Sequence, residues 1–339
     1  MRTSESINAA RLRSVHRRRF PGYVLLIVAT VVSSLAHAQG VAYPARTVRL
    51  VVAYAAGGSN DIVARALAQR LTEAWGQAVI IDNKPGGNTV IGTEAVAKAA
   101  PDGYSLLITP PAITINPALV KKLPYDSLRD FAPVTLININ PQVLVAHPGV
   151  PVATLRELIA LAKARPGGLN YSSSGTGGAN HLAGELFNSM ARVKIVHIPY
   201  KGNAPSLVAL TGGEVDIAFN SLPSALPLVR GGRLRALGVT SRARSGVLPD
   251  LPTLDEAGLP GYEAVAWTGL LAPAATSPAV VAKINAAVVG IVQSADFRER
   301  MKADGSDPVG SSAEQFAAFL RDEIAKWTRV IRYAGVTAD

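Results

Sequence analysis

The chain has no cysteine in its 339 residues, which excludes disulfides, thiol catalysis, cysteine-ligated metals and a cysteine-linked lipid anchor. Aromatic residues make up only 6% of the chain and charged residues 17%, whereas 48% is hydrophobic. Histidines are also few, and His147, His181 and His197 fall one per predicted element, without the spacing of metal ligands. We therefore predict a globular protein of two domains, with no metal and no cofactor.

Long hydrophobic runs are scarce, and the one that stands out lies near the N-terminus. The basic stretch RLRSVHRRRF precedes the apolar run YVLLIVATVVSSL, which ends in the small-x-small sequence AHA. This run is shorter than the roughly 20 apolar residues of a membrane-spanning helix. We interpret residues 1–38 as a secretory signal peptide cleaved after Ala38, with an uncleaved membrane anchor as the alternative. The mature protein is then expected to be soluble and periplasmic.

The signal peptide also carries half of the excess positive charge. Its six arginines and one glutamate account for +5 of the formal net charge of +10, which leaves +5 for the mature chain. The mature chain has no cluster of basic residues interleaved with aromatics, so no nucleic-acid partner is predicted. The remaining charge gives a modest bias towards anionic ligands.

Strand-like and helix-like segments alternate along the mature chain, which indicates parallel sheets with crossover helices. Strands are expected at 46–54, 77–83 and 104–109, with helices at 59–75 and 88–100 between them. The pattern restarts after residue 148, and two long helices, 277–305 and 312–335, end the chain. We predict an α/β fold with two parallel-sheet domains and an interdomain cleft. Domain 1 is discontinuous, 45–142 plus 264–339, and domain 2 covers 143–263.

Two similar glycine-paired turns, GGSND at 57–61 and GGANH at 177–181, each connect a predicted strand to a helix. Paired glycines let the backbone approach a ligand closely, and the N–H groups of a new helix attract an anion. Opposed across a cleft, two such turns would hold a ligand with two acidic groups. Each turn alone is also compatible with ordinary turn chemistry.

Motifs of other functions fail on particular residues. The segment that starts at Gly87 has the glycine spacing of a phosphate loop, but Thr93 replaces its lysine. GTGGAN lacks the third glycine of a dinucleotide fingerprint, because Asn180 stands there. Ser174, His181 and Asp216 could form a triad, but no Gly-x-Ser-x-Gly elbow is present. We therefore predict no enzymatic activity, and an exported hydrolase is the least favoured alternative.

Six blocks of the mature chain, in order, carry a family resemblance, among them YPARTVRLVVAYAAGGSNDIVARALAQRL, YSSSGTGGANHLAGELF and VHIPYKGNAPSLVALTGGEVDIAFNSLPS. They resemble the solute-binding proteins of tripartite tricarboxylate transporters, also called Bug proteins. The resemblance implies a class II periplasmic-binding-protein fold that closes around one organic acid, a di- or tricarboxylate or similar. It also implies a two-component membrane permease, driven by an ion gradient, as the partner. The protein is expected to be a monomer.

The resemblance also implies which residues bind the ligand, since two loops hold its carboxylates in that family. The first loop contributes Tyr54, Ala56, Gly57, Gly58, Ser59, Asn60 and Asp61. The second contributes Ser174, Thr176, Gly177, Gly178, Ala179 and His181. Asn220 stands where many members carry aspartate, which argues against a ligand with an ammonium group.

Two aromatic residues, Tyr200 and Trp267, follow predicted strands and could cap the ligand or pack in the core or hinge. The predicted function is capture of an organic acid by domain closure for a secondary transporter. A periplasmic sensor that docks on a membrane kinase is the alternative, which the sequence does not separate from transport.

Overall fold

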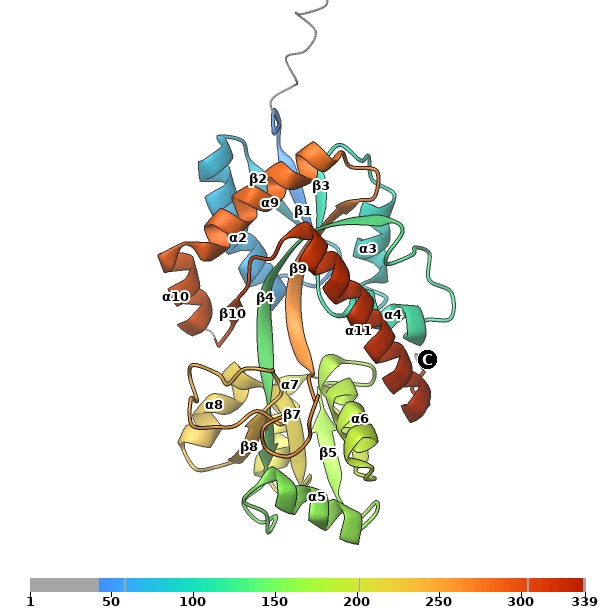
Figure 1. The fold of residues 1–339 in the computed structure, drawn as a ribbon, viewed down its shortest axis with the longest axis vertical. Coiled ribbons are helices and arrows are strands. Elements are labelled where there is room, and N and C mark those ends of the chain that lie inside the picture. The colour runs from blue at the N-terminus through green and yellow to red at the C-terminus, as the bar shows by residue number, and fades with distance from the viewer. Residues whose placement is uncertain (1–42, 58, 201, 304, 338–339) are drawn as a thin grey trace, which may run out of the picture. The chain divides into compact units, whose positions relative to one another are not determined.

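The computed structural model describes residues 43–337 except 58, 201 and 304 (Figure 1). Residues from Arg46 onward form one compact unit, and the architecture below is that of this unit. The predicted signal peptide and its cleavage site after Ala38 lie outside the described residues, as does Gly58 of the first glycine turn.

The first sheet contains three parallel strands at the positions that the sequence predicts. β1 (Val48–Val52) pairs in parallel with β2 (Val79–Asn83) and with β3 (Ser105–Thr109). Helices α2 (Ser59–Trp75) and α3 (Val90–Ala97) connect these strands. β1 and β3 are rich in buried Val, Leu and Ile because both faces of such a sheet are covered by helices.

The second sheet is built from the segment after residue 147. β5 (Asn170–Ser173) pairs in parallel with β6 (Val196–Pro199) and β7 (Ile217–Ser221). Four helices accompany this sheet in the order that the sequence predicts, and β8 (Arg235–Val239) follows them. The helices are α5 (Leu155–Ala164), α6 (Ala179–Ala191), α7 (Asn203–Thr211) and α8 (Leu222–Arg230).

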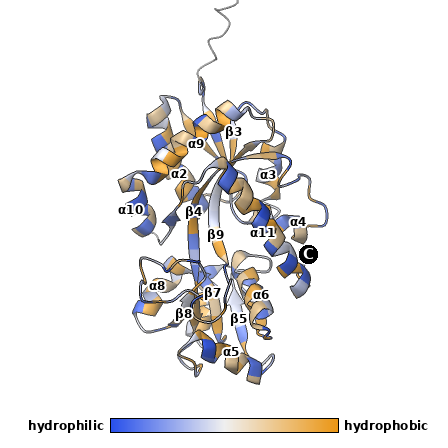
Figure 2. Cartoon of the chain, in the orientation of Figure 1, coloured by the Kyte–Doolittle hydropathy of each residue, from blue (hydrophilic) through white to orange (hydrophobic). Residues whose placement is uncertain are grey.

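Two long strands run between the sheets and make both of them mixed rather than purely parallel. β4 (Phe131–Ala146) pairs antiparallel with β9 (Val265–Pro273) in the first sheet and with β7 and β8 in the second. β9 also pairs antiparallel with β3. β4 therefore opposes the parallel strands of the second sheet, and β9 opposes those of the first. The stretch of β4 between the sheets is hydrophilic (Figure 2).

The pairing directions make the carboxyl ends of the two sets of parallel strands point towards each other. β1 and β3 run in the direction of β4, because β9 is antiparallel to both β3 and β4. β5 and β7 run in the opposite direction to β4. Thr109 at the end of β3 is level with Leu136 of β4, and Ser221 at the end of β7 is level with Gln142. Six residues of strand separate these levels, about 20 Å at 3.3 Å per residue.

The last helix, α11 (Ala313–Ala334), takes part in two hydrophobic cores. Its first turn is fixed by a capping box between Ser312 and Gln315. Phe316 packs in the cluster of the first sheet, while Trp327 and Ile331 pack with α6 residues in the cluster of the second. The short helix α4 (Ala112–Leu119), which the sequence did not predict, contributes Leu119 to that same second cluster.

The predicted helix 277–305 is instead two helices, α9 (Pro278–Gln293) and α10 (Ala295–Ala303), which meet at an angle of 66°. Ser294 breaks the helix with an extended ψ of 145°. The two-residue strand β10 (Asp307–Pro308) follows and pairs with β4. In the described part of the chain no single helix is long and apolar enough to cross a membrane; α9 and α10 pass that test only as a bent pair, by length and composition.

Candidate functional site

Both glycine-paired turns lie at the facing carboxyl ends of the parallel strands. The first turn follows β1 and opens α2, and the second follows β5 and opens α6. A Cβ placed on Gly177 of the second turn would lie 2.8 Å from Leu119 Cδ2 of α4. The second turn therefore touches a helix of the first sheet, which places the turn at the junction between the two sheets.

Asp61 organises the first turn instead of facing solvent. Its Oδ2 accepts the N–H of Gly57 at 2.9 Å and Arg65 Nε at 2.8 Å, while Oδ1 accepts Asn83 Nδ2 at 2.9 Å. The residue is only 1% exposed. The hydrogen bond from Arg65, helped by those from Gly57 and Asn83, lowers the pKa of Asp61 to about 2. This carboxylate stabilises the loop, so its predicted contact with ligand is not supported in this conformation.

Asn60 supplies a polar group that the fold leaves without a partner. Its Oδ1 accepts the Thr268 hydroxyl at 3.3 Å, whereas its buried Nδ2 donates to no described residue. An amide N–H buried in this way carries a desolvation cost unless a ligand or water accepts it. Asn60 is thus a candidate donor to an anion at the N-terminus of α2.

The other described residues of the first turn are open to solvent. Ala56, Gly57 and Ser59 are exposed, and Tyr54 is 40% exposed. Desolvation by surrounding protein nevertheless raises the pKa of Tyr54. Contact of Tyr54 with ligand stays a prediction.

The second turn is held by side-chain hydrogen bonds from below. The Ser174 hydroxyl donates to Asn180 Oδ1 at 2.9 Å, and Asn180 Nδ2 donates to the carbonyl of Phe219 at 2.7 Å. These two hydrogen bonds tie the second turn to β7 near its carboxyl end. Thr176 remains exposed, and Gly178 and Ala179 are half-buried at the start of α6, where first-turn N–H groups lack helical acceptors.

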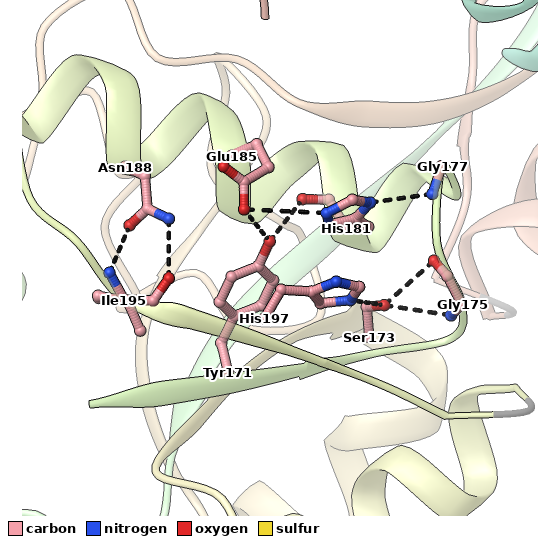
Figure 3. A network of polar contacts seen from close by, with 9 residues as sticks. All are labelled: Tyr171, Ser173, Gly175, Gly177, His181, Glu185, Asn188, Ile195 and His197. Carbon is pink, nitrogen blue, oxygen red and sulfur yellow. Dashed lines mark hydrogen bonds and ion pairs between the residues drawn. The ribbon is translucent and has the colours of Figure 1, made fainter. Parts of the chain in front are cut away.

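His181 lies beneath the second turn within a buried polar network (Figure 3). Its Nδ1 accepts the N–H of Gly177 at 2.9 Å, and its ring stacks on that of His197 with centroids 3.8 Å apart. Burial, with a smaller effect of His197, lowers the pKa of His181 to about 3, and burial lowers that of His197 to about 4. Both imidazoles are therefore neutral at pH 7, and neither supplies a cation for an anionic ligand.

Asn220, near the carboxyl end of β7, is fully buried, and neither its Oδ1 nor its Nδ2 has a hydrogen-bond partner in the part of the chain that the structure describes. Gln142 Oε1 and Asn203 Oδ1 are likewise unpartnered. Gln142 lies on β4 level with the end of β7, and Asn203 opens α7. The sequence analysis missed these two residues; the polar run ININPQ within a strand was the available signal for Gln142.

The two aromatic candidates, Trp267 and Tyr200, both pack against hydrophobic residues. Trp267 lies within β9 rather than after a strand, is fully buried, and packs edge-on against Phe316. Tyr200 packs against the hydrophobic cluster of α7 and α8, and desolvation and the Glu214 carboxylate raise its pKa. Trp267 thus packs in the core, the alternative stated for it, whereas Tyr200 is only half-buried, and a contact of either residue with ligand stays a prediction.

The fold defines a class of protein: a two-lobed α/β binding protein whose parallel strands end facing each other. Within the described ranges, no three His, Asp or Glu side chains gather as metal ligands. Residues 63–336 match the family model of the tripartite tricarboxylate transporter family receptor, and the chain belongs to that family.

Individual relatives agree with this assignment. Protein BugT of Bordetella pertussis is 38% identical over 86% of this chain and 90% of its own. A Rhodopseudomonas palustris protein solved with adipate is 37% identical, with a TM-score of 0.74 over 87% of this chain and all of the other. MatC from the same species, with bound malate, is 34% identical, with a TM-score of 0.70 over 85% of this chain and all of its own. The family is one of receptors rather than enzymes.

Proposed function

We propose that this protein is a periplasmic receptor that captures a small dicarboxylate between its two glycine-paired turns and delivers it to a two-component permease driven by an ion gradient. The observation that carries the proposal is that β1 and β5, the strands that lead into the N-termini of α2 and α6, point towards each other from the two sheets. Adipate and malate, the molecules bound in two relatives, are both dicarboxylates.

Hydrogen-bond donors rather than charged side chains would recognise the carboxylates. His181 and His197 are neutral, and Arg65 is paired with Asp61. The remaining donors are the first-turn N–H groups of α2 and α6, the exposed hydroxyl of Ser59 or Thr176, and the unpartnered Asn60 amide. These groups suit an anion but discriminate weakly between acids of similar length. Asn220, whose donor and acceptor have no partner among the described residues, suits a carboxyl or hydroxyl group at the second end of the ligand.

Closure of the two lobes would complete the site. We propose residues 45–142 with 264–339 as one lobe and 143–263 as the other, acting as a monomer. The register supports this division, since the last β4–β9 pair joins Pro141 to Val265 and the β4–β7 pairing begins at Gln142. A ligand that bridges both turns makes its full set of contacts only in the closed form, and so shifts the population towards it.

Thermal unfolding and native mass spectrometry of residues 39–339 test the proposal. Adipate and malate are added, with hexanoate as a control of one carboxylate. A dicarboxylate at 100 times its dissociation constant should add about 2.7 kcal/mol of stability, whereas hexanoate should add much less. If neither dicarboxylate is retained or shifts the unfolding, these ligands are wrong. Delivery to the permease is tested separately, as receptor-dependent uptake of a bound dicarboxylate by cells that express the permease pair.

A further inference from the structure

The second turn needs an external restraint because its own backbone is permissive. Gly175 has φ 140° and Gly177 has φ 76°, conformations that glycine enters and leaves readily. The direction of the N–H groups in such a segment is therefore set by what they bond to. In this structure two side chains provide those bonds, and both belong to the network of Figure 3.

One restraint acts on Gly177 and the other on Gly175. Gly177 donates directly to His181 Nδ1 at 2.9 Å. Gly175 donates to Ser173 Oγ at 3.1 Å, and this hydroxyl lies 2.6 Å from His197 Nε2. The two imidazoles come from different elements, α6 and β6, and stack at 3.8 Å with 15° between their planes. Each ring thus keeps the other in place while it holds one glycine.

We propose that His181 and His197 form a stacked pair of positioning residues that fixes the second turn in its ligand-binding conformation. The inference rests on the proposed function for the identity of the ligand, but not for the structure of the turn. The pair turns the Gly177 N–H towards the network, and the next N–H, that of Gly178, closes the turn on the Gly175 carbonyl at 3.3 Å. The N–H groups available to an anion would then be those of the first turn of α6 that follow Gly178. The ring of His181 itself does not contact ligand: the residue is 4% exposed, and its Nδ1 is occupied.

The arrangement also fixes the protonation state of His181. Nδ1 accepts a hydrogen bond only without a proton, so the proton of the neutral ring is on Nε2, which faces Glu185 Oε1 at 3.8 Å. Glu185 in turn lies 2.7 Å from the Tyr171 hydroxyl. The titratable groups around His181 are therefore His197 on β6, Tyr171 on β5 and Glu185 on α6. A proton added to Nδ1 would break the bond to Gly177.

Two substitutions at residue 181 separate the acceptor from the ring. His181→Asn keeps an acceptor, Oδ1, at the same number of bonds from the backbone, whereas His181→Phe keeps a stacking ring without one. We expect His181→Phe to weaken adipate binding about tenfold or more, since a turn that is rarely in the competent conformation lowers apparent affinity by that fraction. His181→Asn should stay within about threefold of the wild type. Equal affinities for the two variants would overturn the proposal.

Measurements without ligand keep this test independent of the proposed function. Nitrogen NMR of the wild-type protein should show an unprotonated Nδ1 on His181 and a slowly exchanging Gly177 amide, and the amide should exchange faster in His181→Phe than in His181→Asn. A proton on Nδ1, or a rapidly exchanging Gly177 amide in the wild type, refutes the positioning role even if adipate binds. If neither adipate nor malate binds, the proposed ligands fail while these ligand-free signals still decide the role of the pair.

Discussion

Substitution of Gly177 by alanine should destabilise the protein through two separate effects. The residue has φ 76°, in the left-handed region that costs an L-residue about 1–2 kcal/mol. The new Cβ would also lie 2.8 Å from Leu119 Cδ2, closer than carbon atoms approach without a shift. Leu119 is 5% exposed and packed in the second hydrophobic cluster, so it has little room to move.

The neighbouring glycine provides a matched control. Gly178 has φ −73°, an ordinary value for any residue, and a Cβ there would meet the Gly175 carbonyl at 3.3 Å and Ser174 Oγ at 3.6 Å. Gly178→Ala should therefore change the free energy of unfolding by less than about 0.5 kcal/mol, because neither strain nor a severe contact arises. Gly177→Ala should cost about 2 kcal/mol.

Thermal unfolding of the two variants, side by side, measures this difference. For a unit of nearly 300 residues, about 2 kcal/mol corresponds to a fall in Tm of roughly 3 °C. Equal Tm values for Gly177→Ala and Gly178→Ala would refute both the left-handed conformation of Gly177 and its contact with Leu119. Gly178→Val adds a functional arm: it should abolish adipate binding while the protein stays folded, because a branched Cβ blocks close approach of the ligand to the backbone.

Three further predictions concern charged and polar side chains of the candidate site and of the network beneath the second turn. Asp61→Asn should lower the free energy of unfolding by about 1 kcal/mol, measured in urea. The fall in the pKa of Asp61 from 3.8 to about 2 corresponds to at most about 2.4 kcal/mol. Roughly half of this remains because solvent screens the partner, Arg65. This contribution is present above pH 3.8 and is lost as the pH falls towards 2, so the wild-type and Asn proteins should converge in acid. The depressed pKa values of His181 and His197 make the unfolded chain bind more protons below pH 6.5, so stability should fall between pH 7 and 5, by up to about 2 kcal/mol per histidine. The raised pKa of Glu185 has the opposite effect on stability over this pH range. In urea unfolding at pH 7 and pH 5, the free energy of unfolding of His197→Phe should fall less than that of the wild type. Asn220→Leu should weaken adipate binding about tenfold in calorimetry, because the ligand would lose the donor and the acceptor proposed for its second end, while unchanged affinity would place Asn220 outside the site.

The sequence predicted those parts of the fold that depend on local pattern. The helix expected at 59–75 spans the observed α2, because its apolar positions recur at helical spacing and the glycine turn marks its start. The parallel pairs of β1 with β2 and β3 follow from the alternation of strands and helices. The two turns, predicted from their glycines, do lie at facing strand ends.

Features that depend on tertiary partners were not predictable in this way. β4 runs through two sheets for 16 residues, and its polar middle hides the periodicity of a strand. The break at Ser294 divides a segment whose composition favours one continuous helix. The family resemblance implies ligand binding by Asp61, whereas its three internal partners include Asn83, from the following strand, whose approach no local pattern reveals.

A site built from helix N-termini makes affinity depend on closure. Each N-terminus carries about half a positive charge, so two of them balance about half of the charge of a dicarboxylate. In the proposed site the rest of the binding energy would come from hydrogen bonds, and those of the α2 turn and the α6 turn would reach the ligand together only when the lobes are closed. One lobe alone offers about half a charge and half of the donors, so it should hold a dicarboxylate weakly, and opening should be followed by rapid release. A cationic side chain in either turn would tighten binding to the open form, which is a reason for a receptor that must unload its ligand to keep His181 neutral and Arg65 paired with Asp61.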